Sequence, residues 1–148
     1  MSKSTLQNPL LTTAFAVAIY SVTAKAGDWP QWRGPTSNGH TAKADPLPAK
    51  LHRSPRVVWR IDVGSGHSAP VTQGNRVAIA EQQDGSESLR LVDKRTGKLL
   101  WEMVYGQTYE DRFGAGPRCA PLFDGDRIYA QTCRGKLSCL NVKNGSKL

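Results

Sequence analysis

One block of sequence occurs twice in this chain, and the spacing between its two copies limits the fold more than any other feature. Pro70 and Pro121 are 51 residues apart, whereas Gly97 and Gly145 are 48 residues apart. The second copy is therefore shorter, and a shorter hairpin turn at 133–136 accounts for the difference. A period of about 50 residues with four short strands per unit is typical of a β-propeller blade.

Each copy has the pattern of short strands joined by tight turns. The clearest example is 89–101, where two apolar runs flank a polar turn. Gly97 suits the left-handed backbone conformation that closes such a turn, and Asp93 and Thr96 can hydrogen-bond locally to its backbone. The pattern also predicts short strands at 68–71 and 76–80, turns at 73–75 and 124–126, and a longer loop at 82–87.

Together these elements predict an all-β chain, a partial β-propeller built from four-stranded antiparallel blades. One full blade is expected at 67–105, and a partial blade at 118–148 stops just before its own Trp strand. The run 57–63 is predicted to be a strand, and its Trp59 matches Trp101 of the full blade. We therefore expect about two blades plus an orphan N-terminal strand, which in a closed propeller would complete the last blade.

The first 26 residues have the organisation of a Sec-type signal peptide. Lys3 supplies a positive charge, 10–22 is apolar, and Ala24 and Ala26 form a small-x-small cleavage site. The alternative is a membrane anchor, but the apolar run is shorter than the roughly 20 residues of a spanning helix. We predict cleavage after Ala26, a periplasmic or secreted location, and no transmembrane span in the mature chain.

Residues 27–56 are rich in Pro and Gly and lack periodicity, which predicts an extended N-terminal arm lying along a surface. Trp29 and Trp32 are expected to anchor the arm in a groove. The alternative interpretation is that the two rings bind a ligand.

Charge and cysteine content exclude some classes of function. The formal net charge is +8, but the basic residues are scattered, so nucleic-acid binding is not expected. The spacing of Cys119, Cys133 and Cys139 matches no zinc motif. A two-residue turn after Cys133 would pair Cys139 with Ala130 and direct Cys133 and Cys139 to opposite faces, which argues against a disulfide. Buried small apolar side chains are the expected role.

Several residues of the repeat resemble the PQQ-like (quinoprotein-type, BamB-like) β-propeller repeat family. The matching residues are Ser68, Pro70, Val71, Gly74, Arg76, Val77, Asp93, Thr96, Gly97, Lys98 and Trp101. The opening 28–35 is similar to the start of exported members of this family. The resemblance implies that 57–148 is an incomplete PQQ-like propeller. It also implies that Gly97, Gly145, Trp59 and Trp101 are packing residues that tie adjacent blades together.

The second copy departs from the family pattern at its turn. Asn141 replaces Asp, Asn144 replaces Thr and Ser146 replaces Lys. Cys139, like Leu91 in the first copy, stands where the family commonly has a small residue. These departures predict a less regular turn and less regular packing of the tryptophan against it, but they do not change the prediction of a blade.

The family also contains enzymes, which hold PQQ and a calcium ion over the central channel. Calcium there needs carboxylate and amide oxygens, and the reaction needs an Asp base. The chain contains no adjacent cysteine pair of the kind many such enzymes carry, and its acidic residues are not clustered with ligand spacing. No cofactor or metal site is therefore predicted in this chain, although a full-length relative could carry PQQ with calcium.

The register of the repeat singles out a candidate site. His67 and Arg118 are 51 residues apart, so they occupy equivalent positions just before the innermost strand of each blade. In a propeller that position opens onto the mouth of the central channel. With Arg112 in the neighbouring loop, they are candidate rim contacts for an anion or polar group. The alternative is that they are ordinary loop residues.

Two functional hypotheses follow. The first is an exported, non-catalytic propeller that acts as a binding or scaffold module in the cell envelope, with envelope proteins or polysaccharide as partners. The second is the N-terminal fragment of a PQQ-dependent, alcohol-type quinoprotein dehydrogenase. Because the predicted blades leave sheet edges uncovered, self-association through those edges is also expected.

Overall fold

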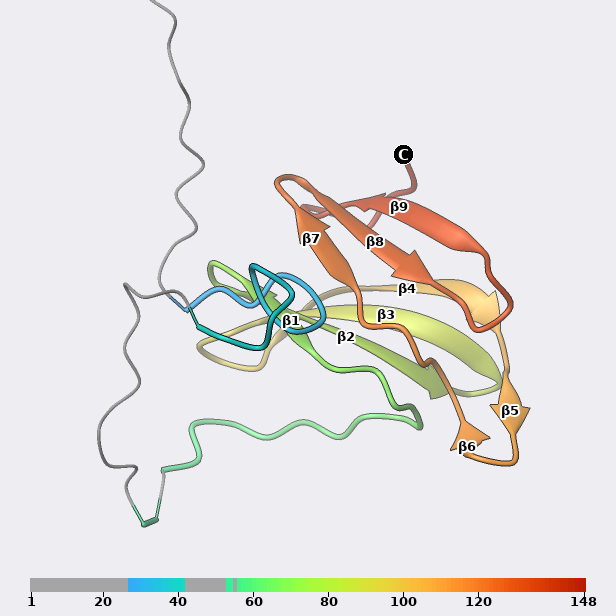
Figure 1. Cartoon of the computed structure of the whole chain (residues 1–148), viewed down its shortest axis with the longest axis horizontal. Coiled ribbons are helices and arrows are strands. Elements are labelled where there is room, and N and C mark those ends of the chain that lie inside the picture. Colours follow the sequence, from blue (N-terminus) through green and yellow to red (C-terminus); the bar gives the residue numbers. More distant parts are fainter. Residues whose placement is uncertain (1–26, 42–52, 55) are drawn as a thin grey trace, which may run out of the picture.

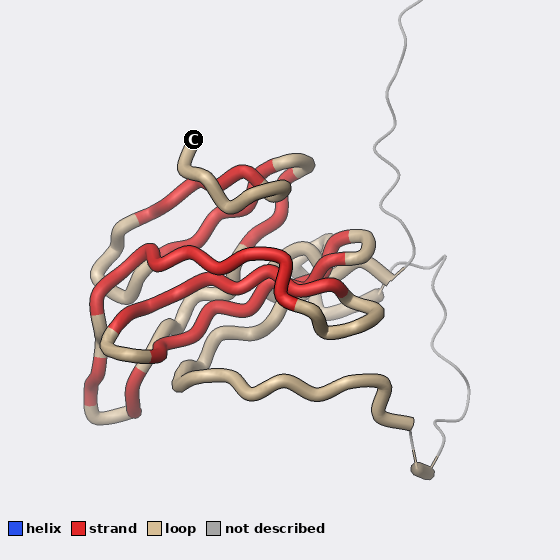
Figure 2. The backbone as a smooth tube through the Cα atoms, turned by 180° about the vertical axis from the view of Figure 1, so that it is seen from behind, coloured by secondary structure: helices blue, strands red, loops and turns tan. Residues whose placement is uncertain are grey.

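A computed structural model describes residues 27–41, 53–54 and 56–148. The predicted signal peptide and the middle of the predicted arm lie outside the described residues. Within the described ranges all regular structure is β, in antiparallel sheets of four, two and three strands. The two larger sheets lie face to face, as Figures 1 and 2 show from opposite sides. The fold is thus a partial β-propeller, as predicted.

The four-stranded sheet is the full blade that the repeat predicts. Its strands are β1 (Val71–Gln73), β2 (Arg76–Gln83), β3 (Ser86–Asp93) and β4 (Leu99–Gln107). Each strand pairs with the next along the chain, in the order β1-β2-β3-β4. Because consecutive strands are antiparallel neighbours, only tight turns are needed between them.

The loop predicted at 82–87 is wrong. In the structure β2 and β3 are joined by a two-residue turn, in which Asp84 has a φ of 49° and Gly85 a φ of 78°. Two successive positive φ values match the right-handed twist of the strands, and Asp-Gly is a favoured pair for such a turn. As a result Glu87 belongs to β3 rather than to a loop.

The second blade has three strands. They are β7 (Leu122–Asp124), β8 (Arg127–Gln131) and β9 (Leu137–Asn141), in the order β7-β8-β9. On the free side of β9, Lys147 pairs with Leu140 in an isolated bridge. The position corresponds to the start of β4 in the first blade, where Leu99 pairs with Val92.

The register around the cysteines differs from the predicted one. Cys139 lies opposite Tyr129 rather than Ala130, because the turn between β8 and β9 extends from Thr132 to Lys136. All three cysteines are free thiols of intermediate burial, so they are less buried than predicted.

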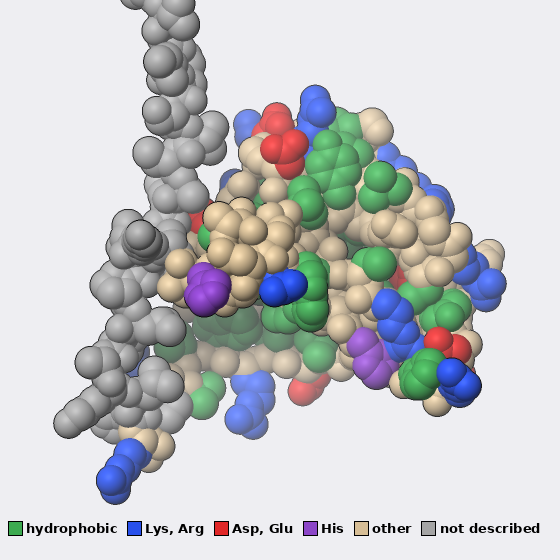
Figure 3. All heavy atoms as spheres, viewed as in Figure 1, with side chains coloured by type: hydrophobic (Ala, Val, Ile, Leu, Met, Phe, Trp, Pro, Cys, Tyr) green, Lys and Arg blue, Asp and Glu red, His purple; other side chains and the backbone are tan. Residues whose placement is uncertain are grey.

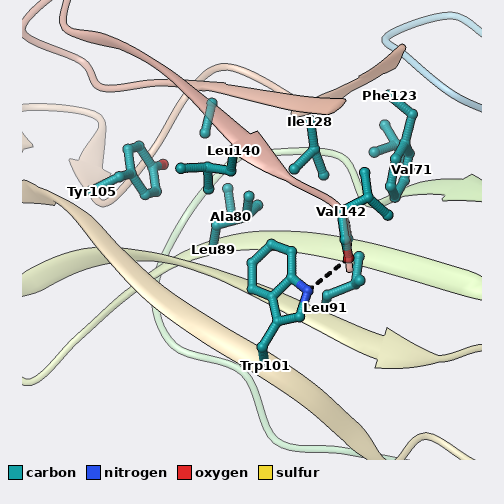
Figure 4. Close-up of a cluster of buried hydrophobic side chains, with 12 residues drawn as sticks. Val71, Ala80, Leu89, Leu91, Trp101, Tyr105, Phe123, Ile128, Leu140 and Val142 are labelled. Carbon is teal, nitrogen blue, oxygen red and sulfur yellow. Dashed lines mark hydrogen bonds between the residues drawn. The ribbon is translucent and has the colours of Figure 1, made fainter. Parts of the chain in front are cut away.

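The hydrophobic core lies between the two larger sheets (Figure 4). Leu89 and Leu91 of β3 are fully buried and face the second blade, where Ile128 and Leu140 are fully buried as well. Burial of one such side chain contributes roughly 1.5–3 kcal/mol. The other buried members of this core are Val71, Ala78, Ala80, Trp101, Tyr105, Phe123, Ala130 and Val142. Each sheet therefore depends on the other for its apolar face.

The strand predicted at 57–63 does not form. The structure assigns no strand there, and only Ser65, just beyond it, makes a bridge to Gln82. Val57 and Val58 are 66% and 67% exposed, because no neighbouring strand covers them in the described structure. Trp59 nevertheless holds the segment on the first blade: its indole Nε1 donates to the carbonyl oxygen of Lys94 at 2.8 Å.

The described part of the N-terminal arm is less extended than predicted. Residues 31–39 form successive turns, closed by backbone hydrogen bonds such as Gly39 N to Arg33 O at 2.8 Å. The backbone of Trp29 pairs with Thr72 of β1, whereas its ring lies against Gly34 of the arm itself. Trp32 is 63% exposed, so its predicted anchoring role is wrong. Besides the bridge of Trp29, the N–H of Phe123 donates to the carbonyl oxygen of Pro30 at 2.9 Å, and the N–H of Gly74 donates to Asp28 Oδ1 at 2.7 Å, so several hydrogen bonds attach the arm to both blades.

A small hairpin lies between β4 and β7, in the stretch that the sequence analysis treated as the loop carrying Arg112. Its strands are β5 (Glu110–Asp111) and β6 (Gly114–Ala115). In Figure 1 it projects beyond the end of the first blade, between β4 and β7. This hairpin positions the candidate site.

Candidate functional site: the rim at the β5–β6 hairpin

The segments that lead into β1 and β7 meet at one end of the molecule. The backbone N–H of His67 donates to the carbonyl oxygen of Pro117 at 2.9 Å. The hairpin residue Gly114 lies next to both segments. Arg118 Nη2 donates to the carbonyl oxygen of Gly114 at 2.7 Å. A Cβ added to Gly114 would lie 3.2 Å from Nε2 of His67. The structure therefore brings the predicted residues His67 and Arg118 to the same hairpin.

The carboxylate of Asp111 organises this rim. Its Oδ1 accepts from the backbone N–H of Phe113 at 2.8 Å and from Arg118 Nη2 at 2.7 Å. Its Oδ2 accepts from the hydroxyl of Tyr109 at 3.1 Å. These donors, the Phe113 N–H first, lower the pKa of Asp111 below its usual value. The carboxylate is thus ionised and fully engaged in holding the hairpin.

Tyr109 forms the aromatic wall of the rim. The guanidinium groups of Arg118 and Arg134 lie 5.7 Å and 5.9 Å from the centre of its ring. Its hydrogen bond to Asp111 raises the pKa of its phenol, because donation to a carboxylate favours the protonated form. Two cations facing one ring hold the residue before β5, the segment between β6 and β7, and the β8–β9 turn together.

The third predicted residue, Arg112, lies at the tip of the hairpin. Its guanidinium is 4.6 Å from the centre of the Phe113 ring, and that ring is 67% exposed. Figure 3 shows cationic, acidic, hydrophobic and histidine side chains gathered where Figure 1 places β5 and β6. The rim therefore has an inner polar cluster and an outer tip made of an arginine and an aromatic ring.

Behind the polar cluster lies a partly buried thiol, that of Cys133. Cys133 Sγ is 3.5 Å from the carbonyl oxygen of Gly116, to which it can donate. Burial raises the pKa of this thiol. Nη1 of Arg118 is also buried and has no hydrogen-bond partner among the described residues. An uncharged thiol packed behind an arginine is a structural element rather than a nucleophile.

Sequence reasoning missed two buried polar residues next to this region, Glu87 and Tyr105. Glu87 is fully buried, and neither carboxylate oxygen has a hydrogen-bond partner among the described residues. Tyr105 is 1% exposed, and burial, followed by the charge of Glu87, raises the pKa of its phenol. The Asp84–Gly85 turn was the signal that could have found Glu87, because it places Glu87 on the same strand face as Leu89.

A groove opens beside these residues between β4 and the β8–β9 turn. Its volume is about 380 Å³. Two cationic residues, Arg134 and Lys136, line one side, and the backbone of Gly106 lines the other. The remaining lining residues are Val104, Tyr105, Gln107 and Thr132. The groove is thus mainly apolar with a positively charged side, and Arg134 connects it to the ring of Tyr109.

These residues do not fit a site for PQQ with calcium. Calcium requires several carboxylate or amide oxygens converging on one point. No group of three or more His, Cys, Asp or Glu side chains with such geometry exists in the described ranges. The one rim carboxylate that hydrogen bonds bring into the cluster, Asp111, is occupied by three donors.

The repeat motif residues form two equivalent docking contacts. The indole Nε1 of Trp101 donates to the carbonyl oxygen of Val142 at 2.9 Å, as Trp59 does to Lys94. A Cβ added to Gly145 would lie 2.8 Å from the Trp101 ring, and one added to Gly97 would lie 2.8 Å from the Trp59 ring. Each tryptophan thus lies flat against a glycine of the blade that follows it.

The turns that carry these glycines are held by side-chain oxygens. In the first blade Asp93 Oδ1 accepts from the N–H groups of Arg95 and Thr96 at 3.0 Å and 2.9 Å. In the second blade Asn141 Oδ1 accepts from the N–H of Lys143 at 2.8 Å. Asn therefore serves in place of Asp, and the departure from the repeat pattern leaves the turn intact.

Comparison with known proteins agrees with this architecture. Among the described residues no helix is long and apolar enough to cross a membrane. A search of curated proteins finds no match to the chain. A family model described as outer membrane protein assembly factor BamB matches residues 48–148, which include both blades and the docking tryptophans. The chain therefore belongs to the PQQ-like repeat family represented by the outer membrane protein assembly factor BamB.

Proposed function

We propose that this chain is an exported, non-catalytic binding module of the cell envelope that engages a protein partner through the tip of the β5–β6 hairpin. One observation carries the proposal. The tip presents the Phe113 ring, 67% exposed, with the guanidinium of Arg112 stacked 4.6 Å from its centre. Arginine and aromatic residues are enriched in the central contacts of protein interfaces.

The base of the hairpin supports this role because it is rigidly held. Asp111 is joined to Arg118 at 2.7 Å, and Gly116 N donates to the carbonyl oxygen of Tyr109 at 2.9 Å. A preorganised loop loses little conformational freedom on binding, so more of the contact energy appears as affinity. The same engagement of Asp111 leaves it poorly suited to act as a catalytic base.

The envelope location rests on two supports. The family is named after an outer-membrane protein assembly factor. The first 26 residues have the charge, apolar run and cleavage site of a signal peptide. The mature chain is expected to begin at Gly27, which the mass of the protein released from the periplasm by osmotic shock would establish. Retention of the intact chain in the cytoplasm would contradict export.

The binding tip can be tested by photo-cross-linking in intact cells. A photoreactive phenylalanine at position 113 is expected to form a discrete adduct with an envelope protein. The same residue at position 100 is the matched control, because Leu100 is exposed at 49% but lies on β4. Arg112→Ala is expected to weaken the position-113 adduct several-fold. Equal adducts at positions 113 and 100 would contradict the proposal, and an adduct to polysaccharide would replace the protein partner with a glycan.

The alternative function, an N-terminal fragment of a quinoprotein dehydrogenase, is tested separately. PQQ and calcium are titrated into the purified chain, followed by absorbance and by reduction of an electron-accepting dye. Saturable binding with turnover would overturn the non-catalytic assignment.

A further inference from the structure

We propose that the groove between β4 and the β8–β9 turn binds an extended, acidic peptide segment, which pairs with the free edge of β4 and directs carboxylates toward Arg134 and Lys136. The proposal is independent of the hairpin tip, because the groove and the tip have no residue in common. It follows from the course of the groove, the unpaired edge of β4 and the charge of the opposite wall.

The groove follows the edge of β4 rather than either face of its sheet. Val104 and Tyr105 are successive strand residues, and side chains at successive positions of a strand point to opposite faces. Accordingly, Val104 is 57% exposed, whereas Tyr105 lies in the core between the blades. Both nevertheless line the groove, as do Gly106 and Gln107. A groove that contacts successive residues from both faces runs along the edge of the strand.

This edge of β4 has no strand partner in the part of the chain that the structure describes. There β4 is the last strand in the sheet order and pairs only with β3. The register shifts between Glu87 and Ser88, and Tyr105 has no counterpart in β3. Such bulges are common at sheet edges and beside active sites. Because an edge strand directs part of its N–H and C=O groups outward, an extended segment can add to β4 through backbone hydrogen bonds.

The β8–β9 turn forms the opposite wall and supplies the charge. Figure 1 shows this turn beside the end of β4. Arg134 and Lys136 line the groove, and neither forms an ion pair with a described residue. The guanidinium of Arg134 lies 5.9 Å from the centre of the Tyr109 ring. The carboxylate of Glu87 lies behind Gly106 and does not line the groove. The charge of this wall therefore complements carboxylates on the occupant.

An extended peptide is the occupant that fits all three features. Its backbone can pair with β4, and its alternate side chains point in opposite directions. Carboxylates on one side can therefore face the two cations, while apolar side chains on the other side contact the apolar part of the groove. A single small anion would use the cations but leave the strand edge unpaired. The groove volume of about 380 Å³ also exceeds what one small anion fills.

Fluorescence anisotropy of labelled peptides tests the proposal on the purified chain. The probes have about six residues, a usual strand length, in which valine alternates with glutamate or with lysine. The glutamate peptide is expected to bind saturably and the lysine peptide is not. A glutamate peptide with methylated backbone nitrogens keeps the charges but loses the donors, so its binding is expected to be about tenfold weaker. Equal affinity of any two of these peptides, or no saturable binding, would overturn the proposal.

A charge reversal locates the binding on the turn. Lys136→Glu is expected to weaken binding of the glutamate peptide about tenfold, because attraction becomes repulsion. The side chain of Lys136 is exposed and only its backbone bonds to Thr132, so the turn is kept. Lys143→Glu is the matched control, since Lys143 is exposed in the turn at the opposite end of β9 and should leave the affinity unchanged. Equal affinities of the two variants would overturn the assignment to the groove.

Amide hydrogen exchange tests the pairing with β4 directly. Backbone amides within Val104–Gln107 are expected to exchange more slowly when the glutamate peptide is bound. Unchanged exchange there would overturn strand pairing even if the peptide binds. An oligogalacturonate serves as the competing glycan probe. If it displaces the peptide at an equal concentration of carboxylate, the groove is a site for anionic glycans and the peptide assignment is wrong.

Discussion

At the scale of single residues, the glycines of the repeat have two separate roles. Gly145 has a φ of 72° and lies against the ring of Trp101. Gly125 has a similar φ of 60°, but a Cβ added there would meet nothing within 4 Å. Both positions require a left-handed backbone, whereas only Gly145 also requires the absence of a side chain. The two positions therefore separate backbone strain from loss of packing.

Gly145→Ala is expected to destabilise the fold more than Gly125→Ala. The left-handed conformation costs each alanine about 1–2 kcal/mol. At position 145 displacement of the Trp101 ring adds about 1–3 kcal/mol. The measurement is the free energy of unfolding in urea, followed by tryptophan fluorescence. Equal losses in the two variants would show that the ring contact does not constrain position 145.

The Asp111 carboxylate makes the rim sensitive to acid. Its pKa is lowered in the folded chain by the Phe113 N–H and then by Tyr109 and Arg118. A carboxyl group whose pKa is lower in the folded chain than in the unfolded chain stabilises the fold. The contribution is complete above the unfolded-state pKa of about 4 and is lost as the pH falls through the folded-state pKa. NMR signals of Tyr109 are therefore expected to be constant from pH 7 to about pH 4 and to shift below it. Asp111→Asn should remove that shift, and a shift that persists in this variant would assign the acid sensitivity elsewhere.

At the scale of elements, strand β4 and the segment 57–63 are each attached to the blade that follows by one tryptophan. Trp101 of β4 is 9% exposed, and its hydrogen bond to Val142 is buried. Trp59 makes the equivalent bond to Lys94 at an exposed site, from a segment that forms no ladder. The same indole-to-carbonyl hydrogen bond thus forms in two environments that differ in their access to water.

Trp101→Phe is expected to cost more stability than Trp59→Phe. Loss of the indole N–H leaves the buried Val142 carbonyl without its donor, which costs about 1–3 kcal/mol. At Lys94 water can replace the indole, so the expected cost is below about 1 kcal/mol. Thermal unfolding of the two variants beside the wild type measures the difference. A larger loss from Trp59→Phe would mean that the segment 57–63 contributes more to the fold than its exposure indicates.

At the scale of the whole molecule, stability comes from the contact between the sheets rather than from either sheet alone. Leu89 and Leu91 on one side and Ile128 and Leu140 on the other are fully buried in a shared core. In repeat architectures each unit buries its apolar face only against its neighbour. Each of the two blades therefore depends on the other for the burial of one apolar face.

Much of the fold was predictable because it depends on local or periodic properties. The offset between Pro70 and Pro121 indicated equivalent blades, and the structure contains a four-stranded and a three-stranded sheet at those positions. Gly97 has the predicted left-handed φ, at 71°. Turn conformation depends on a few neighbouring residues, and strand periodicity repeats along the chain, so both can be inferred from sequence.

The sequence alone thus determined the β class, the length of the blade and the turn glycines, whereas the structure showed which glycine each docking tryptophan contacts. Only the tertiary structure decided that 57–63 forms no strand, that Trp32 is exposed, and that Arg118 is bound to Asp111. These outcomes depend on which neighbours cover a segment or a charge. The periodicity of a sequence shows which face of a strand is apolar. Which segment buries that face, or pairs with the edge of the strand, depends on parts of the chain that are distant in sequence and meet only in the folded structure.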